Sequence, residues 1–159
     1  MQTDWKGEAL LRIAGIFPCS LVNGDGIRYV VFTQGCGHHC HGCHNPETWD
    51  FNGGIEVYPE LIAADYMTRK HLDGITLSGG DPFYQQEACV ELLKLLPGVN
   101  VWIYTGFEYN IICDTELAQM ADVLVTGPYV EALRCEGKMY GSSNQEIHRK
   151  GVCPTCQKE

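Results

Sequence analysis

The chain has 159 residues, a length that indicates one domain with a single hydrophobic core. Its net charge of −9, with basic residues spread along the chain, argues against a nucleic-acid partner. The apolar runs are too short to span a bilayer, and the N-terminal residues lack the order of a secretion signal. We therefore expect a cytoplasmic protein without a membrane partner.

Short segments rich in Val, Ile and Tyr alternate with segments of helical periodicity. In chain order, the predicted strands are residues 11–17, 28–33, 74–78, 99–105 and 122–126. The predicted helices are residues 59–71, 84–96 and 114–120. This alternation predicts an α/β fold with a mostly parallel sheet. Five strands are too few to close an eight-stranded barrel, so a partial (open) β/α barrel and a small doubly wound sheet both fit.

Polar or glycine-rich segments follow three of the predicted strands. A cysteine cluster follows residues 28–33, Gly79-Gly80-Asp81 follows residues 74–78, and Thr105-Gly106 ends the next strand. Chemistry in such folds lies at the carboxyl ends of the parallel strands. We therefore expect the three segments to meet at one rim of the sheet.

The cysteine cluster is the main chemical signal in the sequence. The chain has nine cysteines, an odd number that argues against a disulfide framework, and Cys36, Cys40 and Cys43 have the spacing C-x3-C-x2-C. Three thiolates can hold three irons of a [4Fe–4S] cluster and leave the fourth iron open to another ligand.

A zinc site is the alternative interpretation of the same segment. Its fourth ligand would be one of four nearby histidines, namely His38, His39, His41 or His44. From the triplet alone, both metals remain open.

The wider pattern resembles the radical S-adenosylmethionine superfamily. The segments VNGDGIR (22–28), FTQGC (32–36) and GCHNPETWD (42–50) are similar to those of glycyl-radical-enzyme activases. The segments SGGDP (78–82), WIYTGF (102–107) and GSSNQ (141–145) resemble the branch that acts on anaerobic ribonucleoside-triphosphate reductase. Where that group often has an acid, this chain has Thr126.

The resemblance implies a fold and a set of cofactor-binding residues. Residues 1–150 would form one radical S-adenosylmethionine domain with a partial barrel, and residues 151–159 a short cysteine-containing tail. Cys36, Cys40 and Cys43 would bind a [4Fe–4S] cluster, and S-adenosylmethionine would bind its open iron. The residues implied around S-adenosylmethionine are Gly42, Cys43 and His44 near the adenine and Gly79, Gly80 and Asp81 near the amino group. Without the resemblance, Gly79 to Asp81 read as an ordinary strand-to-helix turn.

The resemblance also implies an activity and two partners. The protein would cleave S-adenosylmethionine reductively and generate a glycyl radical on the large subunit of the anaerobic reductase. An external one-electron reductant, flavodoxin-like or similar, would supply the electron. A radical enzyme acting on a small molecule such as a pterin, and a non-enzymatic zinc or iron–sulfur module, are the competing hypotheses.

The remaining cysteines carry weaker signals. Cys153 and Cys156 in the tail fit half of a zinc site, a dithiol pair or two ordinary cysteines. Cys19, Cys89 and Cys113 lie in apolar or helical contexts, for which buried structural thiols are expected.

Overall fold

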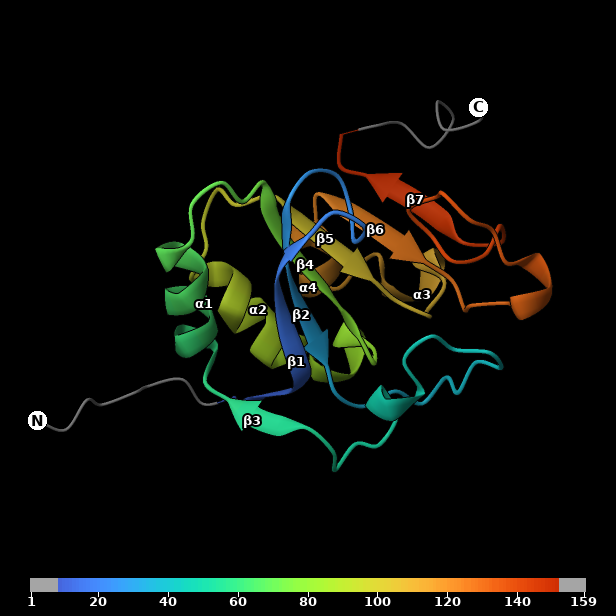
Figure 1. Ribbon diagram of the computed structural model, residues 1–159, viewed down its shortest axis with the longest axis horizontal. Helices are drawn as coiled ribbons and strands as arrows, with labels where there is room; N and C mark the ends of the chain where they lie inside the picture. The colour runs from blue at the N-terminus through green and yellow to red at the C-terminus, as the bar shows by residue number, and fades with distance from the viewer. Residues whose placement is uncertain (1–8, 152–159) are drawn as a thin grey trace, which may run out of the picture.

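The computed structural model describes residues 9–151, so Cys153 and Cys156 lie outside the described residues. Within this range one seven-stranded sheet has the order β3-β1-β2-β4-β5-β6-β7 (Figure 1). The strands are β1 Leu11–Ser20, β2 Arg28–Thr33, β3 Ile55–Val57, β4 Gly74–Gly79, β5 Val101–Tyr104, β6 Val123–Thr126 and β7 Glu146–Arg149. Strands β2, β4, β5 and β6 are parallel, whereas β1, β3 and β7 pair antiparallel with their neighbours.

Helices connect the parallel strands. The α-helices are α1 Pro59–Thr68, α2 Gln86–Lys94, α3 Tyr109–Ile112 and α4 Glu116–Met120, and the short 3-10 helices are η1 Pro46–Thr48, η2 Pro82–Gln85 and η3 Glu131–Leu133. Pro59 begins α1, where a missing N–H costs nothing. The hydroxyl of Thr115 caps α4 by accepting a hydrogen bond from the Ala118 N–H. Helix α2 buries Cys89, Leu92 and Leu93 on one side, as its apolar spacing predicts.

The main core lies between the sheet and these helices. It joins buried residues of the strands, such as Val31, Leu77 and Ile103, to Leu92 of α2 and Leu117 of α4. A second, smaller cluster on β5 and β6 is made of Trp102, Val123 and Val125. Hydrophobic burial on both faces thus holds the parallel strands in place and fixes where their carboxyl ends lie.

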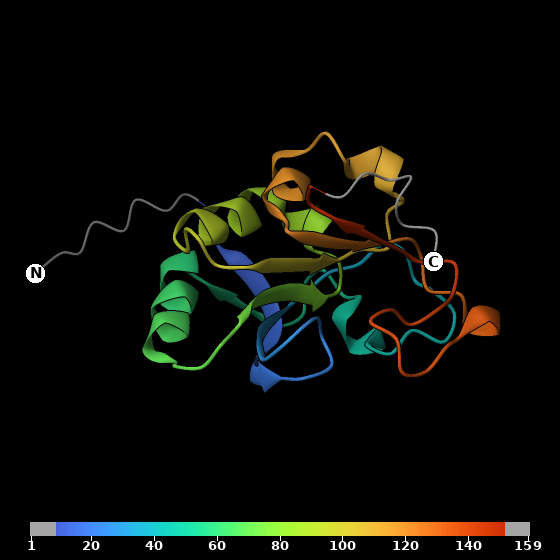
Figure 2. The same ribbon diagram turned by 90° about the horizontal axis from the view of Figure 1, so that it is seen from above.

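Two long segments lie side by side at the end of the sheet away from α1. One follows β2 and carries the clustered cysteines, and the other is the β6–β7 connection, as both views show (Figures 1 and 2). The intervening strand ends of β4 and β5 face the same region. The fold therefore brings the predicted polar segments together at one rim.

The predicted fold class is confirmed: the centre of the sheet is parallel and the sheet is open, with β3 and β7 at its edges. All five predicted strands are present, but β3, β7 and α3 were not predicted. The predicted helix at residues 84–96 is shorter, because the chain first forms the 3-10 turn η2 after Asp81. In the described part of the chain, no helix has the length and apolar character needed to cross a membrane.

Candidate functional site

A pocket lies at the carboxyl ends of β4, β5 and β6. Cys36, Cys40 and Cys43 all line it, together with the glycines at the end of β4. The cavity measures about 180 Å³ and is open to solvent on one side. The structure therefore brings the cysteine triplet and the glycine-rich strand end to one place, as expected from the sequence.

The cysteine loop is held by backbone hydrogen bonds to the turn that follows it. The N–H of Gly35 donates to the carbonyl of Thr48 at 2.7 Å, and the N–H of Cys36 donates to that of Trp49 at 3.2 Å. Cys36 is buried, whereas Cys40 and Cys43 are partly exposed. The three thiols are thus on a short loop whose two ends are tied together.

Burial raises the pKa of the Cys36 thiol above its ordinary value, and the nearby carboxylate of Asp81 and the thiol of Cys40 add to this rise. A cysteine that binds a metal must lose its proton. A positively charged metal group in the pocket would offset the cost of a thiolate at this buried position.

The pocket has no ready-made site for a single metal ion: among residues 9–151, no group of three His, Cys, Asp or Glu side chains is arranged to hold one. In addition, the indole N–H of Trp49, which lines the pocket, is buried with no partner among the described residues. A bound group with acceptor atoms beside the ring would satisfy it.

The four histidines of the zinc interpretation have other contacts. His38 lies 2.7 Å from the carboxylate of Asp81, and the imidazole of His41 is almost fully exposed beside Glu131. The ring of His39 stacks on Trp49. His44 lines the pocket and packs against Tyr129 of the β6–β7 connection.

The glycines after β4 are required by close backbone packing. A Cβ on Gly79 would come within 2.5 Å of the Thr33 backbone, and its φ of +96° also disfavours other residues. A Cβ on Gly80 would lie 2.4 Å from the carbonyl oxygen of Gly35. These glycines let the end of β4 lie directly against the start of the cysteine loop, and both line the pocket.

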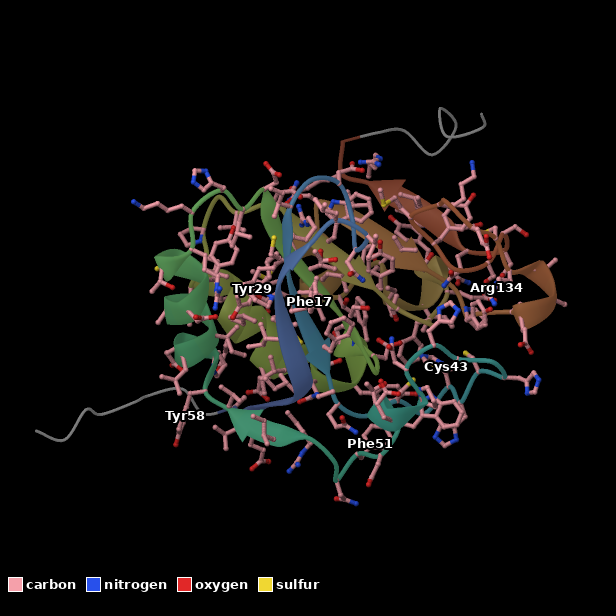
Figure 3. The ribbon with its side chains drawn as sticks, viewed as in Figure 1. Phe17, Tyr29, Cys43, Phe51, Tyr58 and Arg134 are labelled. Atoms are coloured by element: carbon pink, nitrogen blue, oxygen red, sulfur yellow. The ribbon has the colours of Figure 1, made fainter. Side chains whose placement is uncertain are left out.

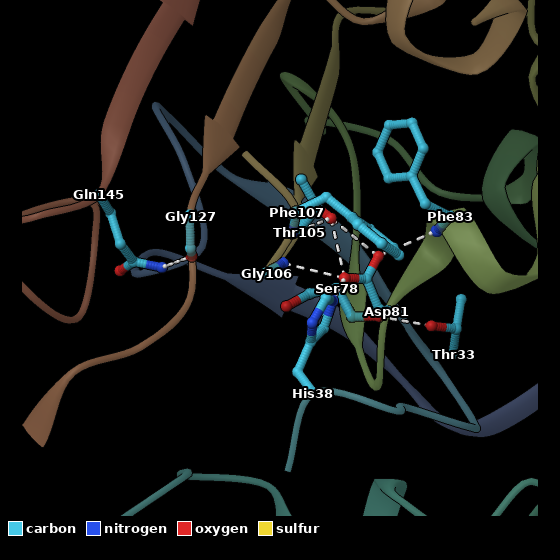
Figure 4. Close-up of polar contacts among 10 residues, drawn as sticks. All are labelled: Thr33, His38, Ser78, Asp81, Phe83, Thr105, Gly106, Phe107, Gly127 and Gln145. Atoms are coloured by element: carbon cyan, nitrogen blue, oxygen red, sulfur yellow. Dashed lines mark hydrogen bonds and ion pairs between the residues drawn. The ribbon is translucent and has the colours of Figure 1, made fainter. Parts of the chain in front are cut away.

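Asp81 and Gly42 are placed differently from the other predicted contacts. Asp81 is fully buried and is not among the residues that line the pocket. Its carboxylate accepts hydrogen bonds from the Phe83 N–H, the Gly106 N–H and the Thr105 hydroxyl (Figure 4). Gly42 also lies outside the lining, and a Cβ there would come within 2.7 Å of the Glu131 side chain.

The β6–β7 connection supplies pocket residues to which the sequence assigned no role. Gly127, Tyr129, Gly141 and Gln145 line the pocket opposite the cysteine loop. The Gln145 amide donates to the Gly127 carbonyl at 2.9 Å (Figure 4). It also accepts from the Gly141 N–H at 2.8 Å. The segment GSSNQ carries only a family resemblance, and no spacing rule indicates that Gln145 joins two distant parts of this loop.

The remaining described cysteines are not alike. Burial raises the pKa of the Cys89 thiol, which confirms the expectation of a structural thiol there. The same expectation is wrong for Cys19, which is exposed, and Cys113 is only partly buried. Cys19 lies near the end of β1.

The fold and the site define an iron–sulfur protein built on an open sheet whose central strands are parallel. Consistent with this, residues 22–148 match the family described as a 4Fe-4S single cluster domain. A solved structure of similar fold is QueE from Escherichia coli, with a TM-score of 0.50 and 18% identity over 63% of this chain and 54% of that one. This likeness concerns the fold.

Curated relatives give a finer assignment. The anaerobic ribonucleoside-triphosphate reductase-activating protein of Salmonella typhimurium is 35% identical over 87% of this chain and 98% of its own length. The proteins of the same name from Escherichia coli and Enterobacteria phage T4 are 35% and 34% identical over 83% of this chain, and the matches cover 94% and 90% of those proteins. The chain belongs to the family of anaerobic ribonucleoside-triphosphate reductase-activating proteins.

Proposed function

We propose that this protein is an activase that cleaves S-adenosylmethionine reductively at a [4Fe–4S] cluster and generates a glycyl radical on anaerobic ribonucleoside-triphosphate reductase. One observation carries the proposal: Cys36, Cys40, Cys43 and the glycines after β4 line a single pocket. Membership of the activating-protein family supports the choice of partner.

The cysteines and the strand ends have separate roles in this proposal. Cys36, Cys40 and Cys43 bind three irons of the cluster, and the fourth iron has no protein ligand. Gly79 and Gly80 present backbone atoms to the amino group of S-adenosylmethionine, since the absence of a side chain permits close approach. Cys43 and His44 border the adenine side of the pocket.

When bound, the cluster supplies one electron that breaks a carbon–sulfur bond of S-adenosylmethionine, giving methionine and a 5′-deoxyadenosyl radical that removes a hydrogen atom from the glycine. The chain orients the reactants and excludes water from the buried side of the pocket around Cys36 and Thr105. An external one-electron reductant, flavodoxin-like or similar, delivers the electron.

The open pocket fits a macromolecular substrate. It is lined by residues of the cysteine loop and of the β6–β7 connection, and Figure 3 labels Cys43 on the first segment and Arg134 on the second. A small molecule held for radical chemistry needs walls on most sides. A glycine-bearing loop of the large reductase subunit would itself supply the missing wall.

The test uses the anaerobically reconstituted and reduced protein, S-adenosylmethionine and the reductase. We expect a glycyl radical on the reductase by electron paramagnetic resonance, together with methionine and 5′-deoxyadenosine. Cys40→Ala should give neither product, whereas Cys19→Ala, which removes an exposed thiol outside the pocket, should behave as the unmodified protein. Cleavage of S-adenosylmethionine without a radical on the reductase would contradict the choice of partner. A colourless, zinc-loaded protein would contradict the cluster.

A further inference from the structure

His38 lies in the cysteine loop but its side chain is directed toward the ends of two strands. Its Nε2 is 2.7 Å from Oδ2 of Asp81, and only 18% of the side chain is exposed. The ring packs edge-on against Phe107, with ring centres 4.6 Å apart. Since a carboxylate only accepts, the imidazole N–H is the donor in this contact.

Asp81 receives donors from three separate segments of the chain. Phe83 of η2 donates its N–H at 3.0 Å. After β5, the Thr105 hydroxyl and the Gly106 N–H donate at 2.8 and 2.9 Å. His38 provides the contact from the third segment, the cysteine loop (Figure 4). The carboxylate is 0% exposed and its acceptor positions are occupied, so it has no free face toward the pocket.

Gly106 provides the space for the imidazole. A Cβ at this position would come within 2.6 Å of the His38 ring. The ring therefore sits directly on the backbone at the end of β5, at a place where any side chain would displace it. Contact with Gly106 favours the same orientation of the His38 ring as the hydrogen bond to Asp81 does.

We propose that His38 and Asp81 are a pair of positioning residues that fix the cysteine loop against the ends of β4 and β5. The inference rests on the proposed function, and adds that Asp81 acts through His38 rather than by touching S-adenosylmethionine. A charge-assisted hydrogen bond in a buried setting is short and directional, which suits this role. The pair sets the distance between the thiols of the loop and the backbone of Gly79 and Gly80.

The experiment compares three substitutions in the reconstituted, reduced protein. His38→Leu removes the donor, His38→Gln keeps an N–H donor, and His41→Leu is the matched control on the same loop, because the His41 side chain is 95% exposed. The measurements are iron content, the dissociation constant of S-adenosylmethionine by equilibrium dialysis, and the change that S-adenosylmethionine causes in the electron paramagnetic resonance spectrum of the cluster.

We expect His38→Leu to keep its iron but to raise the dissociation constant about tenfold and to reduce the spectral change. His38→Gln should recover most of both effects, and His41→Leu should match the unmodified protein. Asp81→Asn should weaken binding as His38→Leu does, and the double variant should be no weaker than either, because the two side chains act as one unit.

The inference fails if His38→Leu binds S-adenosylmethionine normally with an unchanged spectrum, or if the effects of the two substitutions multiply. If Asp81→Asn does not fold, the three histidine variants decide the question alone. Failure of the proposed function has a different signature, since the unmodified protein would then bind no S-adenosylmethionine at all.

Discussion

Arg28 is a charged side chain in the interior of the sheet, with 1% of its surface exposed. Its guanidinium donates to the Thr76 hydroxyl at 3.1 Å, to the Ile75 carbonyl at 2.6 Å and to the Asn100 side chain at 2.8 Å. Burial lowers its pKa below the usual value, because the surroundings disfavour the charge. Neutral oxygens of β4 and of the turn before β5 thus hold Arg28, although an acidic partner is the usual expectation for a buried arginine.

Replacing Arg28 tests how much its hydrogen bonds contribute to the stability of the fold. Arg28→Met should lower the free energy of unfolding of the metal-free protein by roughly 1–3 kcal/mol, because buried oxygens lose their donor. Arg69→Met is the control, since Arg69 pairs with Asp65 on the surface and should cost less than about 1 kcal/mol. Urea denaturation followed by circular dichroism measures both. An equal decrease in the free energy of unfolding in the two variants would contradict the role assigned to Arg28.

For single residues, the sequence identifies the metal-binding side chains but not the side-chain contacts between distant parts of the chain. Cys36, Cys40 and Cys43 could be singled out because ligand type and spacing are local properties. The His38–Asp81 contact could not, because it joins residues 43 positions apart through the packing of a loop on two strand ends. For the same reason the sequence does not reveal that the Asp81 carboxylate is fully buried, outside the residues that line the pocket.

At the element scale, the β6–β7 connection forms one side of the pocket. It contains η3 and little other regular structure, so its shape depends on hydrogen bonds within the loop. The Gln145 amide joins Gly127 at its start to Gly141 and Ser142 near its end. The Ser142 hydroxyl, which accepts from the Val130 N–H, and the Asn144 amide, which donates to the Pro128 carbonyl, add to this network.

Removing the amide should loosen this connection. For Gln145→Met, we expect amide hydrogen exchange in residues 127–145 to become roughly tenfold faster, because the Gly141 and Ser142 N–H groups lose their acceptor. The dissociation constant of S-adenosylmethionine should rise in parallel. Gln119→Met, a change of the same type at an exposed position of α4, should alter neither quantity. Unchanged exchange in Gln145→Met would show that other contacts hold the loop.

Elements were predictable where their apolar pattern was strong. The buried strands β2, β4 and β6 carry Val, Ile or Leu at buried positions, and their places in the chain follow from the sequence. Strands β3 and β7 are three and four residues long and mostly exposed, so they carry no such pattern. They form only because a neighbouring strand offers its free edge.

At the scale of the whole molecule, the hydrophobic core and the site are separate structures. The main core is built from strands and helices, and the cysteine loop takes no part in it. We therefore expect the metal-free protein to be folded, with a cooperative thermal transition by circular dichroism. Reconstitution with iron and sulfide should raise the Tm by several degrees, because the cluster binds only the folded chain.

The Cys40→Ala variant tests this expectation, because its Tm can be compared with that of the unmodified protein before and after reconstitution. Cys40→Ala should have nearly the same Tm as the unmodified metal-free protein, and it should show little increase on reconstitution. A metal-free protein without secondary structure would contradict the separation of core and site. An increase in Cys40→Ala as large as in the unmodified protein would show that metal binds elsewhere.

The sheet ends at β3 and β7 without closing on itself, and the pocket at the carboxyl ends of its central strands is open to solvent. An opening that admits a protein loop also admits dissolved gases. Dissolved oxygen can therefore reach and oxidise the cluster. Protection from oxygen requires that the bound reductase cover the pocket. Preparations stored together with the reductase should consequently outlast those stored alone.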